Sequence, residues 1–126
     1  MLPFNQTLII IPTYNEIDNI ERMLDTLFGL YPEVSLLIIE DGSPDGTAKV
    51  VKDKQAKYKN LHMIERTGKL GLGSAYITGF KWALEREYNY VFEMDCDFSH
   101  DPAQVKDLLE AAQTNDLIIG SRYIEG

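Results

Sequence analysis

The stretch LIIIPTYNE, residues 8–16, decides how this chain is organised. Its first four residues, Leu8 to Ile11, are all apolar, and the residues from Pro12 to Asn15 interrupt the run. A short apolar run without alternating polar residues is typical of a strand that is covered on both faces, as the strands of parallel sheets are. We therefore expect a buried strand over residues 8–11, followed at once by a polar loop.

Strand and helix patterns alternate along the rest of the chain. Apolar residues at helical spacing predict helices, and short apolar runs predict strands. In chain order the expected elements are helix 16–30, strand 34–39, helix 47–58, strand 61–64, helix 74–87, strand 90–94, helix 101–113 and strand 116–119. This alternation without a hairpin signal predicts an α/β fold, with a Rossmann-like, doubly wound, mainly parallel sheet and helices on both faces.

The composition limits the kinds of ligand. The length of 126 residues predicts one domain, residues 1–126, and the net charge of −8 argues against nucleic acid held by a broad basic surface. The single cysteine, Cys96, excludes an internal disulfide framework and fits a reducing compartment. A small anionic ligand would need local positive charge from a metal ion, from a few Arg or Lys side chains, or from helix N-termini.

Acidic residues stand where the second predicted strand ends. Ligands of such sheets bind beyond the carboxyl ends of the strands, and an acid after the second strand commonly accepts hydrogen bonds from a nucleoside. We assign this role to Asp41, assign a helix-capping role to Asp45, and leave the role of Glu40 open. Because an acid on the rim packs little, we expect Asp41→Ala to weaken nucleoside binding and to leave the fold intact.

Asp95 and Asp97 follow the fourth predicted strand and lie two residues apart. In an extended segment they would project to one side, with Cys96 turned the other way into packing. Two carboxylates held together repel each other unless a cation lies between them, and Mg²⁺ or Mn²⁺ is the natural partner. The alternative is a solvated turn before the next helix.

The glycine-rich segment 68–73 matches neither common phosphate-binding loop. Met63 stands where the first glycine of a P-loop would be, and Leu70 replaces its Ser or Thr. Arg66 and Lys69 nevertheless bring two cations to the rim, where they can reach a bound nucleotide. For Lys69 the alternative is a solvated charge on a connector.

Five motifs in order carry a resemblance to a known family. The motifs are PTYNE at 12–16, EDGSPDGT at 40–47, RTGKLGLGSAY at 66–76, DCDFSHDP at 95–102 and GSRY at 120–123. On these motifs the chain resembles family 2 glycosyltransferases from about residue 7 to residue 123, and within that family it is most similar to the dolichyl- or polyprenyl-phosphate mannosyltransferase group.

This resemblance implies an inverting, nucleotide-sugar-dependent transferase with a nucleotide-diphospho-sugar transferase fold. Asp95 and Asp97 would hold Mn²⁺ or Mg²⁺ against the donor diphosphate, Asp97 could also act as a base, and Arg122 would lie near the phosphate of the acceptor. The residues implied around the nucleoside are Pro12, Thr13, Tyr14, Glu16 and Asp41. The implied partners are a GDP-mannose donor and a polyprenyl phosphate, with peripheral membrane contact of the full-length protein at the cytoplasmic face.

Two positions depart from the family pattern. Glu40 stands where relatives usually have Asp, and Ser99 stands where many relatives have a Gln that helps to hold the ion. Relatives also continue for roughly as long again. We therefore expect these 126 residues to be the N-terminal, donor-binding part of a C-terminally truncated protein, binding a nucleotide sugar weakly and transferring nothing alone.

Other classes of protein fit the sequence less well. A receiver domain would need an acidic pair after the first strand, where Thr13 and Tyr14 stand, and a Lys where Arg122 stands. A sugar-nucleotide pyrophosphorylase would need a glycine- and arginine-rich signature in place of PTYNE. A non-catalytic nucleotide-sugar binder of the same fold remains the main alternative.

Overall fold

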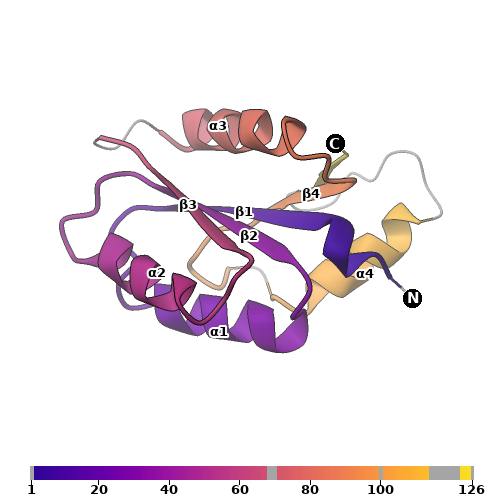
Figure 1. Cartoon of the computed structure of the whole chain (residues 1–126), viewed down its shortest axis with the longest axis horizontal. Coiled ribbons are helices and arrows are strands. Elements are labelled where there is room, and N and C mark those ends of the chain that lie inside the picture. Colours follow the sequence, from indigo (N-terminus) through magenta and orange to yellow (C-terminus); the bar gives the residue numbers. More distant parts are fainter. Residues whose placement is uncertain (1, 68–70, 100, 114–122, 126) are drawn as a thin grey trace.

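The computed structural model describes residues 2–67, 71–99, 101–113 and 123–125. Within these residues a five-stranded sheet in the order β3-β2-β1-β4-β5 lies between two layers of helices (Figure 1). The elements are the 3₁₀ turn η1 (Phe4–Gln6), β1 (Thr7–Thr13), α1 (Ile20–Leu30), β2 (Ser35–Glu40), α2 (Thr47–Gln55), β3 (Leu61–Glu65), α3 (Leu72–Leu84), β4 (Tyr90–Glu93), α4 (Gln104–Ala112) and β5 (Tyr123–Glu125). Strands β1 to β4 pair in parallel, and β5 pairs with β4 in the antiparallel direction.

The central strand β1 separates two hydrophobic cores. Ile9 and Ile11 pack into the cluster formed with α1, α2 and α4, whereas Leu8 and Ile10 pack into the cluster formed with α3. All four side chains are fully buried. Alternate residues of a strand point to opposite faces, so a strand covered on both faces needs an unbroken apolar run. The predicted fold, with helices on both faces, is confirmed.

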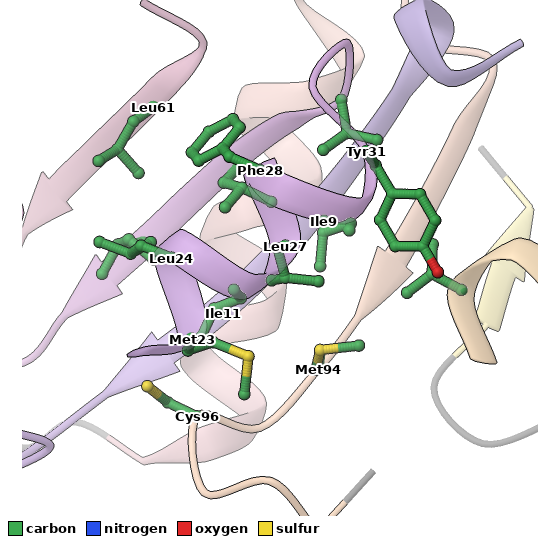
Figure 2. Packing of buried hydrophobic residues seen from close by; sticks show 14 of the residues in the cluster. Ile9, Ile11, Met23, Leu24, Leu27, Phe28, Tyr31, Leu61, Met94 and Cys96 are labelled. Atoms are coloured by element: carbon green, nitrogen blue, oxygen red, sulfur yellow. The ribbon is translucent and has the colours of Figure 1, made fainter. Parts of the chain in front are cut away.

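The larger core lies between α1 and the sheet, and Figure 2 shows how its side chains fill this space. Met23, Leu24 and Leu27 project from α1 towards Ile9 and Ile11. The helix places these residues on one face because they are spaced three and four positions apart.

The smaller core depends on a glycine. Helix α3 lies so close to β1 that a Cβ added at Gly79 would come within 2.8 Å of Cδ1 and Cγ2 of Ile10. These contacts would be shorter than real Cβ atoms tolerate, and they involve a fully buried side chain. The glycine therefore sets how closely α3 approaches the sheet.

The buried Tyr31 fixes the start of α4 against the end of α1. Its hydroxyl donates to the Pro102 carbonyl oxygen at 2.8 Å and accepts from the Lys106 amide at 3.3 Å. Burial raises the pKa of the Tyr31 phenol. Asp101 accepts the Ala103 amide at 2.9 Å in the turn before α4; the sequence predicts this acid as the N-cap, but the N-cap is Ala103.

Several elements differ from the expected ones. Helix α2 ends at Gln55 rather than at residue 58, α3 spans Leu72–Leu84 rather than 74–87, and α4 begins at Gln104 rather than at residue 101. Helix α1 begins at Ile20 rather than at Glu16. The amides of residues 15–17 donate to side chains of a neighbouring loop, and the Asn19 amide closes a turn onto the Glu16 carbonyl oxygen at 3.0 Å. The expected strand 116–119 lies outside the described residues. The antiparallel strand β5 was not predicted. None of the helices in the described part of the chain has the length and apolarity to cross a bilayer.

Candidate functional site

A cleft of about 310 Å³ opens beyond the carboxyl ends of the central strands. The sheet order places β2 and β3 on one side of β1, and β4 on the other, so the connections diverge between β1 and β4. In open α/β sheets ligands bind at this divergence. Nine residues line the cleft, and two of them, Gly71 and Cys96, were not site candidates. The other seven are candidates from the sequence: Pro12, Thr13, Tyr14, Glu16, Asp41, Asp95 and Asp97.

Asp41 is bound by Arg66 in a two-pronged ion pair. Arg66 Nε lies 2.6 Å from Asp41 Oδ1, and Nη2 lies 2.8 Å from Oδ2. Only 7% of the Asp41 side chain and 9% of the Arg66 side chain are exposed. Arg66 also donates to Ser74 Oγ at 2.7 Å, which links the ends of β2 and β3 to α3. The premise that Asp41 packs little is therefore wrong, although Asp41 does line the cleft.

Glu40 holds the loops behind the cleft in place. Its side chain is 1% exposed, its Oε1 accepts the Thr13 hydroxyl at 3.1 Å, and its Oε2 accepts the Ser43 amide at 2.8 Å. The Ser43 hydroxyl donates to Glu40 as well. Glu40, whose role the sequence leaves open between nucleotide binding and structure, does not line the cleft, and its contacts give it a structural role.

Three consecutive backbone amides bind the loop after β1 to the loop after β2. The acceptors are side-chain oxygens of every second residue after β2, namely Ser43, Asp45 and Thr47. The pairs, which we call the loop lock, are Asn15 N to Ser43 Oγ at 2.8 Å, Glu16 N to Thr47 Oγ1 at 3.1 Å and Ile17 N to Asp45 Oδ2 at 3.1 Å.

The loop lock has two consequences for the local structure. It gives acceptors to the amides of residues 15–17, which precede α1, and Asn15 adopts a left-handed φ of 56°. It also leaves the side chains of Tyr14 and Glu16 on the wall of the cleft. Asp45 accepts the Thr47 amide at 3.0 Å at the start of α2, which confirms the predicted capping role of this acid.

Asp95 and Asp97 line the cleft together, as the sequence predicts. The Tyr76 hydroxyl donates to Asp95 Oδ1 at 3.0 Å. Asp97 Oδ1 accepts the Ser99 amide at 3.0 Å, in a turn where Phe98 has a left-handed φ of 60°. The alternative, a turn before the next helix, describes the backbone but does not account for both carboxylates facing one cleft.

Cys96 packs in the core although it also borders the cleft (Figure 2). The residue is 2% exposed, and burial raises the pKa of its thiol to about 12, with further contributions from Glu16 and Asp97. A thiol with this pKa is protonated at neutral pH, so the residue serves as a small apolar side chain.

The acidic groups of the cleft make it favourable for a cation. Burial raises the pKa of the Glu16 carboxyl, and the negative charges of Asp97, Asp45 and Asp95 raise it further, against a hydrogen bond from Asn19 that lowers it. A cation at this position would relieve the repulsion.

The donor set fits a hard divalent ion that arrives with a diphosphate. Within the described residues no three His, Cys, Asp or Glu side chains are grouped to hold a metal by themselves. Mg²⁺ is commonly held by one or two carboxylates together with substrate phosphates. The carboxylates of Asp95 and Asp97 on one cleft satisfy this requirement.

Some candidates lie outside the described residues, and some contacts were not foreseen. Lys69 and Arg122 belong to the segments that the structure does not describe. The roles of Ser43, Thr47 and Tyr76 were not inferred from the sequence, although all three lie inside the quoted motifs. The alternation of Ser43, Asp45 and Thr47 was the only available signal for the loop lock.

Comparison with known proteins gives a consistent set of relatives. The family model described as "Glycosyl transferase family 2" matches residues 8–126. The undecaprenyl-phosphate mannosyltransferase of Micrococcus luteus is 48% identical over 121 residues, which cover 96% of this chain and 50% of that protein. The polyprenol monophosphomannose synthase of Mycolicibacterium smegmatis is 44% identical, over 98% of this chain and 48% of that protein. The chain thus spans about half the length of these curated relatives.

Solved structures share the fold. A mannosyltransferase from Pyrobaculum calidifontis, in complex with GDP-Man and Mn²⁺, aligns with a TM-score of 0.64 and 26% identity over 73% of this chain and 27% of that chain. S. aureus TarS in complex with UDP aligns with a TM-score of 0.68 and 24% identity over 85% of this chain and 32% of that chain, a likeness of fold alone. Both likenesses agree with the α/β fold of this chain.

Proposed function

Because the chain belongs to glycosyl transferase family 2, we propose that its cleft binds a nucleotide sugar together with a divalent cation. We propose further that the full-length protein transfers the sugar, mannose from GDP-mannose, to a polyprenyl phosphate. The observation that carries the proposal is the placement of Asp95 and Asp97 on one cleft with Asp41, at the divergence between β1 and β4.

The activities for which the relatives are named support the choice of donor and acceptor. The curated relatives are named as mannosyltransferases or a monophosphomannose synthase acting with undecaprenyl phosphate or polyprenol. The P. calidifontis structure holds GDP-Man and Mn²⁺. The assignment of mannose, GDP and a lipid phosphate to this chain therefore rests on its similarity to these proteins.

We propose that different parts of the cleft bind the nucleoside and the diphosphate. Pro12, Thr13 and Tyr14 at the end of β1, with Asp41 at the end of β2, offer the surface for the nucleoside. Because Arg66 already holds the Asp41 carboxylate in one orientation, a ribose or base that reaches Asp41 meets a preorganised acceptor. Asp95 and Asp97 follow β4, which lies on the other side of β1 from β2, and we assign the diphosphate to this side of the cleft.

A bound Mn²⁺ or Mg²⁺ would supply charge neutralisation of the diphosphate leaving group. The chain's own carboxylates, Asp95 and Asp97, would hold the ion. A phosphate oxygen of the acceptor forms the new bond to the anomeric carbon while the bond to the donor diphosphate breaks, with inversion at that carbon. Such an oxygen is already anionic near neutral pH, so the reaction requires no strong base, and Asp97 would act as one only for a hydroxyl acceptor.

The remaining candidates complete the proposal. Lys69 would contact the donor phosphates, and Arg122 would contact the phosphate of the acceptor. Since a polyprenyl acceptor is anchored in a membrane, we place the reaction of the full-length protein at the cytoplasmic face. Peripheral contact of the protein with that surface would bring the cleft to the lipid phosphate.

A ligand panel tests the proposal directly. Thermal unfolding of this chain would be followed with GDP, UDP, GDP-mannose and UDP-glucose, each with and without Mn²⁺. We expect guanine nucleotides with Mn²⁺ to raise the melting temperature most, because a ligand that binds only the folded state stabilises it. A larger shift with uracil nucleotides would exclude GDP-mannose as the donor, and no shift with any nucleotide would exclude the site.

A transfer assay tests the second half of the proposal. The full-length protein would be given GDP-mannose, a short polyprenyl phosphate and Mn²⁺, and the mannosylated lipid would be measured. Transfer to the lipid phosphate is the expected result. Nucleotide binding without transfer by the full-length protein would favour a non-catalytic nucleotide-sugar binder.

A further inference from the structure

We infer that Tyr76 is a positioning residue that holds the carboxylate of Asp95 towards the cleft for a divalent cation. This inference deepens the proposed function and rests on it. The residue ends the glycine-rich motif at 66–76, and the proposed reaction gives Tyr76 itself no role.

The contact joins two elements that are distant in sequence. Tyr76 lies on α3 and Asp95 follows β4, 19 residues later, and the hydroxyl lies 3.0 Å from Asp95 Oδ1. The Tyr76 ring is 7% exposed and packs in the smaller core beside Ala75 and Val91. A ring fixed by packing gives its hydroxyl a fixed place, which is what a hydrogen-bond donor needs in order to orient a partner.

Asp95 needs such a partner because it lies beyond the regular part of its strand. Strand β4 ends at Glu93, and the Met94 amide still bonds to the Ile10 carbonyl oxygen at 3.0 Å. The side chain of Asp95 shares the cleft with the negative charges of Glu16 and Asp97. Repulsion favours rotation of the carboxylate away from this wall, and a hydroxyl that donates to a carboxylate opposes the rotation with a charge-assisted bond.

Two further contacts fix the position of helix α3. Arg66, which pairs with Asp41, donates to Ser74 Oγ at 2.7 Å and to Thr78 Oγ1 at 3.4 Å. Gly79 sets the close approach of the helix to β1. The helix therefore links the acid on the nucleoside wall to the acid on the diphosphate wall, through Arg66 on one side and Tyr76 on the other.

The substitution Tyr76→Phe removes the hydroxyl and keeps the buried ring. Mn²⁺ binding would be titrated by electron paramagnetic resonance in the presence of GDP, and GDP binding would be titrated by calorimetry without metal. We expect the apparent Mn²⁺ affinity to fall by about tenfold or more, the loss typical of partners that orient a metal ligand. GDP affinity without metal should be unchanged.

Tyr31→Phe is the matched control. It also removes a buried tyrosine hydroxyl, but that hydroxyl bonds to Pro102 and Lys106 at the start of α4. We expect this variant to melt at a lower temperature and to bind Mn²⁺ with the affinity of the parent chain. The comparison separates a loss of stability from a loss of positioning.

A double substitution shows whether Tyr76 acts through Asp95. In the background Asp95→Asn, Tyr76→Phe should cause no further loss of Mn²⁺ affinity. The inference is overturned if Tyr76→Phe binds Mn²⁺ with the affinity of the parent chain, or if it does not fold. It is also overturned if Tyr76→Phe loses as much affinity for GDP without metal as for Mn²⁺. A further loss of Mn²⁺ affinity when Tyr76→Phe is added to Asp95→Asn would overturn it as well. If GDP and Mn²⁺ bind the parent chain independently, the proposed function fails together with the inference; if they bind cooperatively and Tyr76→Phe changes nothing, the inference fails alone.

Discussion

Arg66 and Asp41 form a buried ion pair in which two guanidinium nitrogens bind the two carboxylate oxygens separately, at 2.6 and 2.8 Å. The pair joins the ends of β2 and β3, and its acid, Asp41, borders the cleft. A residue at the site thus also stabilises the fold, and substitutions of Asp41 should reveal both roles.

We expect Asp41→Ala to lower the free energy of unfolding by about 3–5 kcal/mol, because it leaves the buried Arg66 guanidinium without its counter-charge. Urea denaturation measures the change. The paired substitution Asp41→Leu with Arg66→Met removes both charges and should recover most of the stability. A loss below about 1 kcal/mol, the range of surface ion pairs, would show that the pair is solvated.

Two glycines on α3 should respond to alanine in opposite directions. At Gly79 a Cβ meets Ile10 at 2.8 Å, whereas at Gly73 nothing lies within 4 Å. Gly79→Ala should therefore lower the free energy of unfolding by about 1–3 kcal/mol through overpacking. Gly73→Ala should raise it by about 0.5–1 kcal/mol through helix propensity. Stabilisation by both substitutions in thermal melts would contradict the close approach of α3 to β1.

The loop lock predicts a role for Thr47 in stability. Thr47→Val keeps the shape of the buried side chain and removes the oxygen that accepts the Glu16 amide. We expect a loss of about 1–3 kcal/mol, the cost of leaving a donor unsatisfied. The matched control is Thr26→Val on α1, away from both loops. If the two variants unfold at the same urea concentration, the loop lock does not stabilise the protein.

The thiol of Cys96 should resist alkylation in the folded protein. Burial raises its pKa to about 12, so about one thiol in 10,000 is ionised at pH 8. Iodoacetamide should label the native chain slowly and the chain in 6 M guanidinium rapidly, as followed by mass spectrometry. Raising the pH towards the pKa should increase labelling while the fold persists. Equal labelling rates with and without denaturant would show that Cys96 is exposed.

The sequence was sufficient for the central strands and for the walls of the cleft. The run Leu8–Ile11 has only one stable placement, between two apolar layers, and parallel strands bring their carboxyl ends to one edge. The loops that hold Asp41, Asp95 and Asp97 therefore had to meet. Nothing further was needed to predict that these acids share a site.

The sequence was insufficient where a tertiary contact replaced a local preference. Residues 16–19 have helical spacing, but the loop lock binds the amides of residues 16 and 17, the Asn19 amide closes a turn onto the Glu16 carbonyl oxygen, and α1 begins at Ile20. The bond from Tyr76 to Asp95 depends on the depth at which α3 packs, and this depth is set by Gly79 against Ile10. The ion pair between Arg66 and Asp41 depends on the register of β2 and β3, which spacing along the chain does not define.

The central claim is that Asp95 and Asp97 bind a cation that in turn binds the nucleotide diphosphate. Calorimetric titration of GDP with and without Mn²⁺ tests it in the parent chain and in Asp97→Asn. The control is Asp107→Asn on α4, which removes the same charge outside the cleft. We predict that Mn²⁺ tightens GDP binding by about tenfold or more in the parent and in the control, as expected when phosphates complete a two-carboxylate site, and that Asp97→Asn abolishes this gain. An Asp97→Asn chain that binds GDP with Mn²⁺ as tightly as the parent would contradict the account.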